Sequence, residues 1–305
     1  MSQGLSYEHP EFVFYSTNRT MGSRLWFANN PELQEQIIAW LSRYQDMYGV
    51  VIYGFVLMGN HYHLIAKFPR MNKTSFFKLF NGMIAKLTSV SAPGFEGGKL
   101  WGRRVRVEPI GTPEDVAEMV FHAALNPVRA KLVEHPLEYP SYNSFTDAAL
   151  GEKKKFKILL REDYNNRKRY NSKLTPEDCM VRHTLHYARI PGYEHLPAEE
   201  YSLLMERELE RRRQLLVDEL RSQGASFLGR DALMNEQPGA RIQEEEANRK
   251  GRRSPIRTHS VDVETGFLKW HSSFLEQYRE ASRRYRAGEP VQFPPGTYPP
   301  RPKND

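Results

Sequence analysis

The sequence has a single cysteine, Cys179, so no disulfide can form within the chain and a disulfide-stapled scaffold is excluded. It has no long hydrophobic run: the most apolar stretch, residues 50–58, is well short of the about 20 residues that a bilayer helix needs. The N-terminus has none of the basic, apolar and small-residue pattern of a secretory signal. These absences predict a cytoplasmic protein with no membrane partner.

Basic residues are unevenly distributed along the 305 residues, which carry a formal net charge of +7. Residues 1–150 contain 14 basic and 13 acidic side chains, whereas the remainder contains 30 and 24. A basic half joined to a near-neutral half suggests a polyanionic partner, nucleic acid before membrane. An ordinary solvated surface is the alternative.

Hydrophobic spacing in the first half alternates between strand-like and helix-like segments. We expect strands over residues 11–16, 50–58, 61–68 and 103–109, and helices after Asn30, over 73–90 and after Thr112. This order predicts an α+β fold, the ferredoxin-like split βαβ sandwich, with helices on one face of an antiparallel sheet.

His61 and His63 are the sharpest chemical feature. Side chains two apart in a strand leave the same face, so both imidazoles can bind one divalent metal ion. Two histidines are too few for a site, and two half-buried strand histidines are the simpler interpretation. A third ligand must come from elsewhere. The helix after Thr112 offers candidates in a polar stripe of Asp115, Glu118, His122 and Asn126, although such a stripe is usually solvated.

Several segments match, in order, the motifs of a known family. Residues 58–64 (MGNHYHL) resemble "MPNHxHLL", residues 100–104 (LWGRR) resemble "LWQGRF", and residues 125–133 (LNPVRAKLV) resemble "LNPVRAGLV". Residues 139–145 (YPSYNSF) resemble "YPWSSY". Over roughly residues 11–145 the chain therefore resembles the single-tyrosine HUH transposases, and among them the REP-associated tyrosine transposases.

The resemblance implies a metal-dependent enzyme of DNA transposition that acts on single-stranded or hairpin DNA, as a monomer or homodimer. It implies Mg²⁺ or Mn²⁺ held by His61, His63 and Asn126. Members cut DNA with a helix tyrosine that forms a 5′-phosphotyrosine link. The expected DNA contacts are Arg19, Trp101, Arg103, Arg104, Arg106 and Arg129. The alternative for the basic strand at 103–106 is an exposed edge strand whose charges prevent pairing with another chain.

The chain departs from the family at the nucleophile. The family tyrosine stands four residues before the Asn of the "NP" pair, and His122 occupies that position. Three hypotheses follow: a DNA-binding regulator with impaired catalysis, a hydrolytic nuclease that uses His122 as ligand or base, or a nucleophile supplied by Tyr139 or Tyr142. A scaffold protein without a DNA role is a further rival.

Four regions are expected on composition and resemblance. They are an HUH transposase-like domain at 10–147, a basic helical extension at 148–236, a disordered linker at 237–262, and an amphipathic helix with a proline-rich tail at 263–305. Within the extension, Cys179, His183 and His186 would share one face of a helix, either as packing residues or as zinc ligands.

Overall fold

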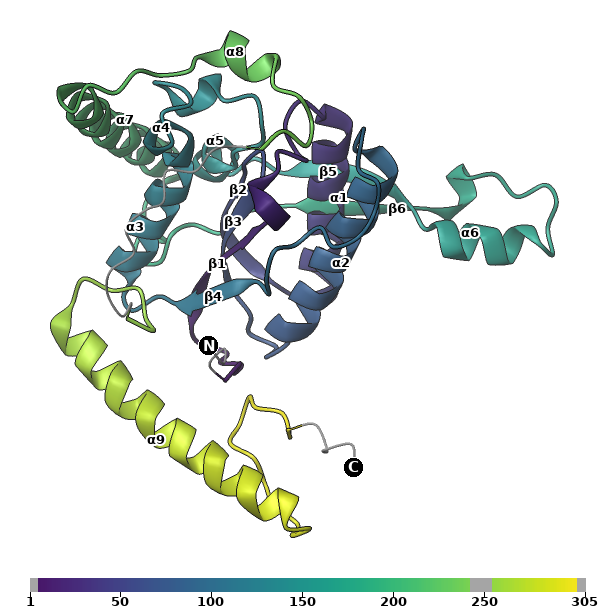
Figure 1. Cartoon of the computed structure of the whole chain (residues 1–305), viewed down its shortest axis with the longest axis vertical. Helices are drawn as coiled ribbons and strands as arrows, with labels where there is room; N and C mark the ends of the chain where they lie inside the picture. The colour runs from purple at the N-terminus through teal and green to yellow at the C-terminus, as the bar shows by residue number, and fades with distance from the viewer. Residues whose placement is uncertain (1–4, 242–253, 301–305) are drawn as a thin grey trace.

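A computed structural model describes residues 5–241 and 254–300. A four-stranded antiparallel sheet with strand order β2-β3-β1-β4 lies at its centre (Figure 1). The strands are β1 (Val13–Arg19), β2 (Val51–Leu57), β3 (His61–Lys67) and β4 (Arg106–Pro109). Helices α1 (Pro31–Tyr48) and α2 (Lys73–Ser91) make the two crossovers. The expected α+β class and the order of these elements are confirmed, with β4 beginning at Arg106 rather than 103.

The remaining elements follow β4 in the chain, except for one short helix that lies between β1 and α1. They are η1 (Met21–Ser23) before α1, then α3 (Pro113–Ala124), α4 (Asn126–Arg129), η2 (Pro136–Glu138), α5 (Phe145–Leu150), β5 (Lys154–Leu159), α6 (Arg161–Lys168), η3 (Glu177–Cys179), β6 (Met180–Leu185), α7 (Ala198–Ser222), α8 (Arg230–Met234) and α9 (Val261–Arg286).

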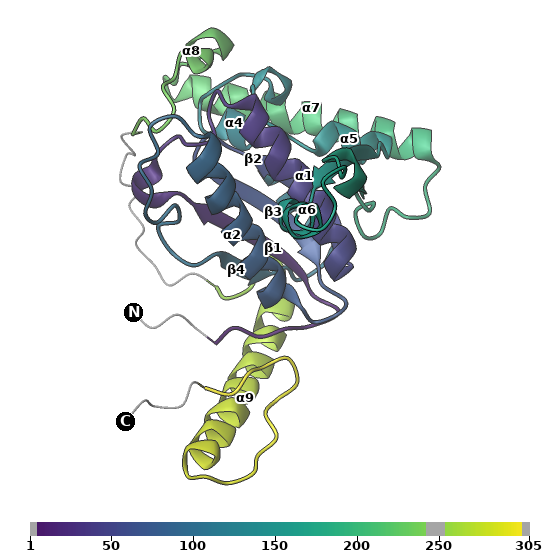
Figure 2. The ribbon, with the colours of Figure 1, turned by 90° about the vertical axis from the view of Figure 1, so that its right-hand side faces the viewer.

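Both faces of the sheet are covered, so the expectation of helices on one face is wrong. Tyr62 and Leu64 pack under α1 and α2, which bury a row of phenylalanines and lie in front of the strands in Figure 2. On the other face Val56 and Ile65 pack under α3, with α7 behind it (Figure 1). Strand β2 is apolar on both sides, and β3 adds Ile65 to the second face, so that face requires its own cover.

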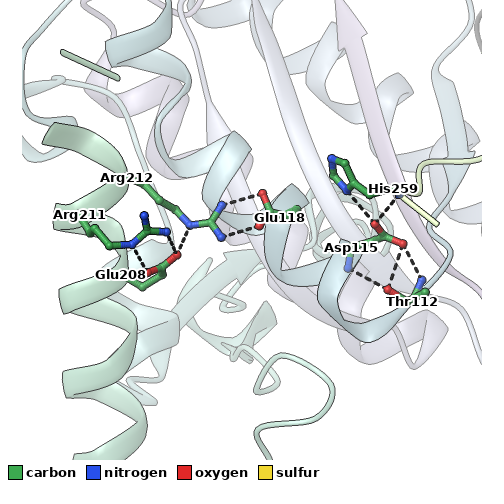
Figure 3. A network of polar contacts seen from close by, with 7 residues as sticks. All are labelled: Thr112, Asp115, Glu118, Glu208, Arg211, Arg212 and His259. Carbon is green, nitrogen blue, oxygen red and sulfur yellow. Dashed lines mark hydrogen bonds and ion pairs between the residues drawn. The ribbon is translucent and has the colours of Figure 1, made fainter. Parts of the chain in front are cut away.

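Helix α3 is fixed at three points by its polar side chains (Figure 3). Thr112 and Asp115 form a capping box at its start. Asp115 also accepts hydrogen bonds from the backbone and ring of His259, each at 3.0 Å. Glu118 pairs with Arg212 of α7, whose Nη1 lies 2.7 Å from Oε2. These contacts join α3 to α7 and to the segment before α9.

The extension is not wholly helical. Strands β5 and β6 form a separate antiparallel hairpin that packs on α1. His183 lies in β6 and its Nδ1 is 2.8 Å from Asp46 Oδ2 of α1, while Cys179 ends the short η3 turn. The helical face proposed for Cys179, His183 and His186 is therefore absent, and the zinc hypothesis loses its basis.

The predicted linker at 237–262 is wrong where the structure describes it, in 237–241 and 254–262. Leu25 donates its backbone N–H to Ala240, and Arg257 makes two backbone hydrogen bonds, to Pro109 at 2.8 Å and from Gly111 at 2.9 Å. Residues 242–253 of the prediction lie outside the described residues. Helix α9 extends away from the sheet, and the proline-rich tail returns so that Gly296 accepts a hydrogen bond from Glu8 (Figure 1).

Replacing Asp115 by alanine should lower the free energy of unfolding by about 2–3 kcal/mol, because it leaves Thr112 and His259 donors without an acceptor. Urea denaturation of Asp115→Ala measures this loss. Glu114→Ala, an exposed neighbour in the same helical turn, should change stability by less than about 0.5 kcal/mol. Equal losses in both variants would contradict an anchoring role for Asp115.

Candidate functional site

A cleft of about 520 Å³ opens on the α3 side of the sheet. Strands β1, β3 and β4 form its floor, α4 one wall, and the segment around α8 another. It gathers most of the residues singled out in the sequence: His61, His63, Asn126, Arg19, Arg103, Arg106, Arg129 and Tyr139. Residues more than 100 positions apart thus line one cavity.

Strand register explains this convergence. In the β1–β3 pair, Thr17 lies opposite His63 and Arg19 opposite His61, so these side chains share the cleft face with Tyr15. The intervening Tyr62 points into the opposite core. Tyr15 was not predicted as a site residue; the alternation of β1, taken with the pairing to β3, is the signal that identifies it.

The two histidines are held in a directed chain of hydrogen bonds. Asn60 donates its amide N–H to Ser23, so its Oδ1 accepts from His61 Nδ1 at 2.6 Å. His61 Nε2 is then an acceptor, and it lies 3.1 Å from His63 Nε2, which must carry the proton. His63 Nδ1 therefore accepts from the Tyr15 hydroxyl at 2.6 Å. The network assigns the tautomers of both imidazoles.

Both imidazoles are neutral near pH 7. Burial, with His122 and Arg19 nearby, lowers the pKa of His63 to about 3. Burial, His63 and Arg19 likewise hold the pKa of His61 well below its usual range. The neighbouring Asn126 side chain partly opposes these shifts in pKa. Neutral nitrogens are the form in which histidine binds a metal ion.

The residues present fit a divalent cation. The described residues contain no group of three His, Cys, Asp or Glu side chains suited to a metal ion, so the third ligand would be the Asn126 amide. Two ligands on adjacent corners of an octahedron with bonds of about 2.1 Å lie about 3 Å apart, and the two Nε2 atoms are 3.1 Å apart. Binding would require the His63 proton to move to Nδ1, with Tyr15 becoming the acceptor.

Arginine dominates the charge of the cleft. Among the described residues five arginines line it: Arg19, Arg103, Arg106, Arg129 and Arg257. Glu236 also lines it, and the buried Glu108 beneath pairs with Arg106 and with Arg257, whose Nη2 is 2.9 Å from Oε2. The balance remains positive and suits an anion. Sequence reasoning missed Arg257 because it comes from the segment assigned to a linker.

His122 lies beside the cleft without lining it. Its ring centroid is 6.2 Å from that of Tyr15, and burial, with Arg129 and Arg257 nearby, lowers its pKa to about 4. The side chain therefore faces the histidine pair as a neutral imidazole. Of the polar stripe on α3 and α4, His122 and Asn126 face the pair, while Asp115 and Glu118 bind other segments.

Other predicted residues have different positions. Tyr142 packs on Phe55 across the sheet, and its hydroxyl binds Asp147 and Tyr187. Trp101 packs on Tyr62 and donates its indole N–H to Asn81. Arg104 is exposed outside the cleft. The structure thus does not bring Tyr142, Trp101 or Arg104 to the histidines, because the aromatic rings are used in the α1–α2 core.

Tyr139 lines the cleft but is already engaged. Its hydroxyl accepts a hydrogen bond from the Gly59 backbone at 2.9 Å, and burial raises its pKa. The turn that carries the histidines is thereby fixed to the 139–145 segment. As placed, Tyr139 supports the turn rather than presenting a free hydroxyl.

No protein-family model matches the chain, and no curated protein matches it. A solved structure of a REP-associated tyrosine transposase bound to a REP hairpin is similar over 48% of this chain and 83% of that one, with 17% identity and a TM-score of 0.39. This distant likeness does not establish a family. Among the described residues, no helix is long and apolar enough to span a membrane.

Stability should fall on acidification partly through His122. Its folded pKa, about 4, lies below the unfolded value of about 6.5, so its contribution is present above pH 6.5 and is lost as the pH falls toward 4. We expect His122→Asn to lessen the loss between pH 7 and pH 5 by about 1–2 kcal/mol. Urea denaturation at both pH values measures it.

The exposed His195 provides the matched control, His195→Asn. A pH profile of His122→Asn that coincides with those of the unmodified protein and of His195→Asn would contradict the assignment of a half-buried neutral imidazole.

Proposed function

We propose that the protein binds single-stranded or hairpin DNA in this cleft, in the manner of the HUH transposases that its motifs resemble. The observation that carries the proposal is the convergence of five arginines on two neutral histidines in one cleft. Arginine guanidinium groups bind phosphate with paired hydrogen bonds. A phosphodiester placed between them would lie next to His61 and His63.

The proposal includes Mg²⁺ or Mn²⁺, which His61, His63 and Asn126 would hold. When bound, such an ion polarises a phosphate oxygen as a Lewis acid. The described ligand set contains no carboxylate and lies among arginines, so DNA phosphate oxygens would have to supply negative charge to the ion. Arg129 and Arg257 would position the phosphate, and Tyr15 and Asn60 would fix the orientation of the imidazoles.

The side chain at the family's nucleophile position limits the chemistry. His122 has no hydroxyl, and the Tyr139 and Tyr142 hydroxyls are bound elsewhere. Joining of strands through a phosphotyrosine on α3 is therefore not open to this chain. We accordingly favour DNA binding with impaired cleavage, a regulator built on a transposase-like site.

Arg129→Ala combined with Arg257→Ala should weaken binding of a hairpin oligonucleotide with a single-stranded extension by about 10-fold or more, and lower the salt dependence by about two phosphate contacts. Fluorescence anisotropy at several salt concentrations measures both. Arg207→Ala, on the exposed surface of α7, is the control. Unchanged affinity in the double variant would contradict binding in the cleft.

His122→Tyr should restore a hydroxyl at the nucleophile position and yield a covalent protein–DNA adduct with the same oligonucleotide and Mn²⁺. We expect no adduct from the unmodified protein or from His122→Tyr combined with His63→Ala. Denaturing gels before and after protease treatment detect it. A metal-dependent nick by the unmodified protein, without an adduct, would instead indicate a hydrolytic nuclease.

A further inference from the structure

A second basic feature projects from the opposite side of the molecule. Residues 152–185, here called the arm, comprise β5, α6, η3 and β6. The arm attaches along α1, and α6 lies at its far end, with α1 between it and the sheet (Figure 1). The cleft lies on the other face of the sheet, so the arm is spatially separate from it.

The arm holds most of the excess positive charge of the chain. It contains 10 basic and 5 acidic residues, a net of +5 out of +7 for the whole protein. Within the described residues, two of those basic side chains form ion pairs: Lys154 with Asp147 and Arg167 with Asp163. The charges of Lys155, Lys157 and Arg169 are left unneutralised by any described carboxylate and face solvent.

Two of these charges lie on one face of β5, and the third lies at the end of α6. Lys155 and Lys157 alternate with the partly buried Phe156, so they share the exposed face of β5 about 7 Å apart. Tyr170 follows Arg169 at the end of α6 and is 93% exposed. A tyrosine this exposed contributes almost nothing to the core, whereas its hydroxyl beside cationic side chains can donate to phosphate.

The arm is held firmly at its base. His183 of β6 bonds Asp46 and Arg43 of α1, and Leu185 is fully buried in the core beneath α1. The ribbon is therefore presented in a fixed orientation, and its side chains lose less entropy on binding than those of a loose loop would.

We propose that the arm binds the phosphate backbone of duplex DNA, as a second DNA surface independent of the cleft. Two-stranded ribbons and short helices fit the grooves and backbone of a duplex. An anionic membrane is the weaker fit, because α6 has no aliphatic residue and buries none of its side chains, and so lacks the apolar face that interfacial helices insert.

The test uses a blunt-ended duplex of about 20 base pairs without single-stranded ends, titrated into the full-length protein by fluorescence anisotropy. The arm variant is Lys155→Glu, Lys157→Glu and Arg169→Glu together. We expect at least a 10-fold loss of affinity at moderate salt and a smaller salt dependence, by about two to three phosphate contacts.

A charge-matched control separates a local from a global effect. Lys78→Glu, Lys86→Glu and Arg207→Glu together change the net charge equally at exposed positions outside arm and cleft. Duplex affinity in the arm variant equal to that of this control would overturn the proposal. So would loss of binding to phosphatidylserine vesicles by the arm variant with unchanged duplex binding. Circular dichroism confirms that both variants are folded.

The cleft variant, Arg129→Ala with Arg257→Ala, distinguishes the two proposals. We expect it to bind the blunt duplex like the unmodified protein, whereas the arm variant keeps binding a single-stranded oligonucleotide. If the arm variant loses duplex binding and the cleft variant binds every oligonucleotide normally, the arm proposal stands and the proposed function of the cleft fails.

Discussion

The pairing of β1 with β3 is the constraint on which the cleft depends. Side chains alternate between faces along both strands, so a shift of one residue in β3 would turn His61 and His63 into the α1–α2 core and Tyr62 toward the cleft. The contrast between the two faces of β3 resists that shift, because the shift would move two histidines into the apolar α1–α2 core. The same pairing brings Tyr15 to hydrogen-bonding distance of His63 and sets the tautomer of the pair.

Helix α3 and the residues after it bring the other parts of the site to the histidines that this register places in the cleft. Asp115 binds the segment that supplies Arg257, Glu118 binds α7, and His122 and the following Asn126 face the histidines. A polar stripe on a helix is usually a solvated surface. Here each position along the stripe has a separate protein partner, which is why α3 has an ordered relation to two distant parts of the chain.

Whether a feature could be predicted from the sequence depends on how far apart along the chain the contacting residues lie. The strand alternation of His61 and His63, the capped start of α3 and the order of sheet elements are local patterns, and they were predicted correctly. Arg257 was missed because its place depends on contacts with β4, about 150 residues earlier. Composition alone gave a disordered linker there.

The aromatic residues show a second limit. Trp101 and Tyr142 belong to side-chain types that serve equally in cores and in base stacking, and the motifs do not say which. Their neighbours Tyr62 and Phe55 decide it. Likewise, the apolar residues on the second face of the sheet were visible in the sequence, but that α7 helps to cover them is a tertiary property.

The late position of Arg257 has a consequence for biosynthesis. The ribosome completes the sheet, α7 and α8 before it adds the segment that places this arginine beside Glu108. A nascent chain that has already folded its sheet therefore carries a cleft with one cation fewer and with Glu108 less fully compensated. An anion bound in the cleft would therefore meet the full set of arginines only after residue 257 has been added and has folded back onto β4.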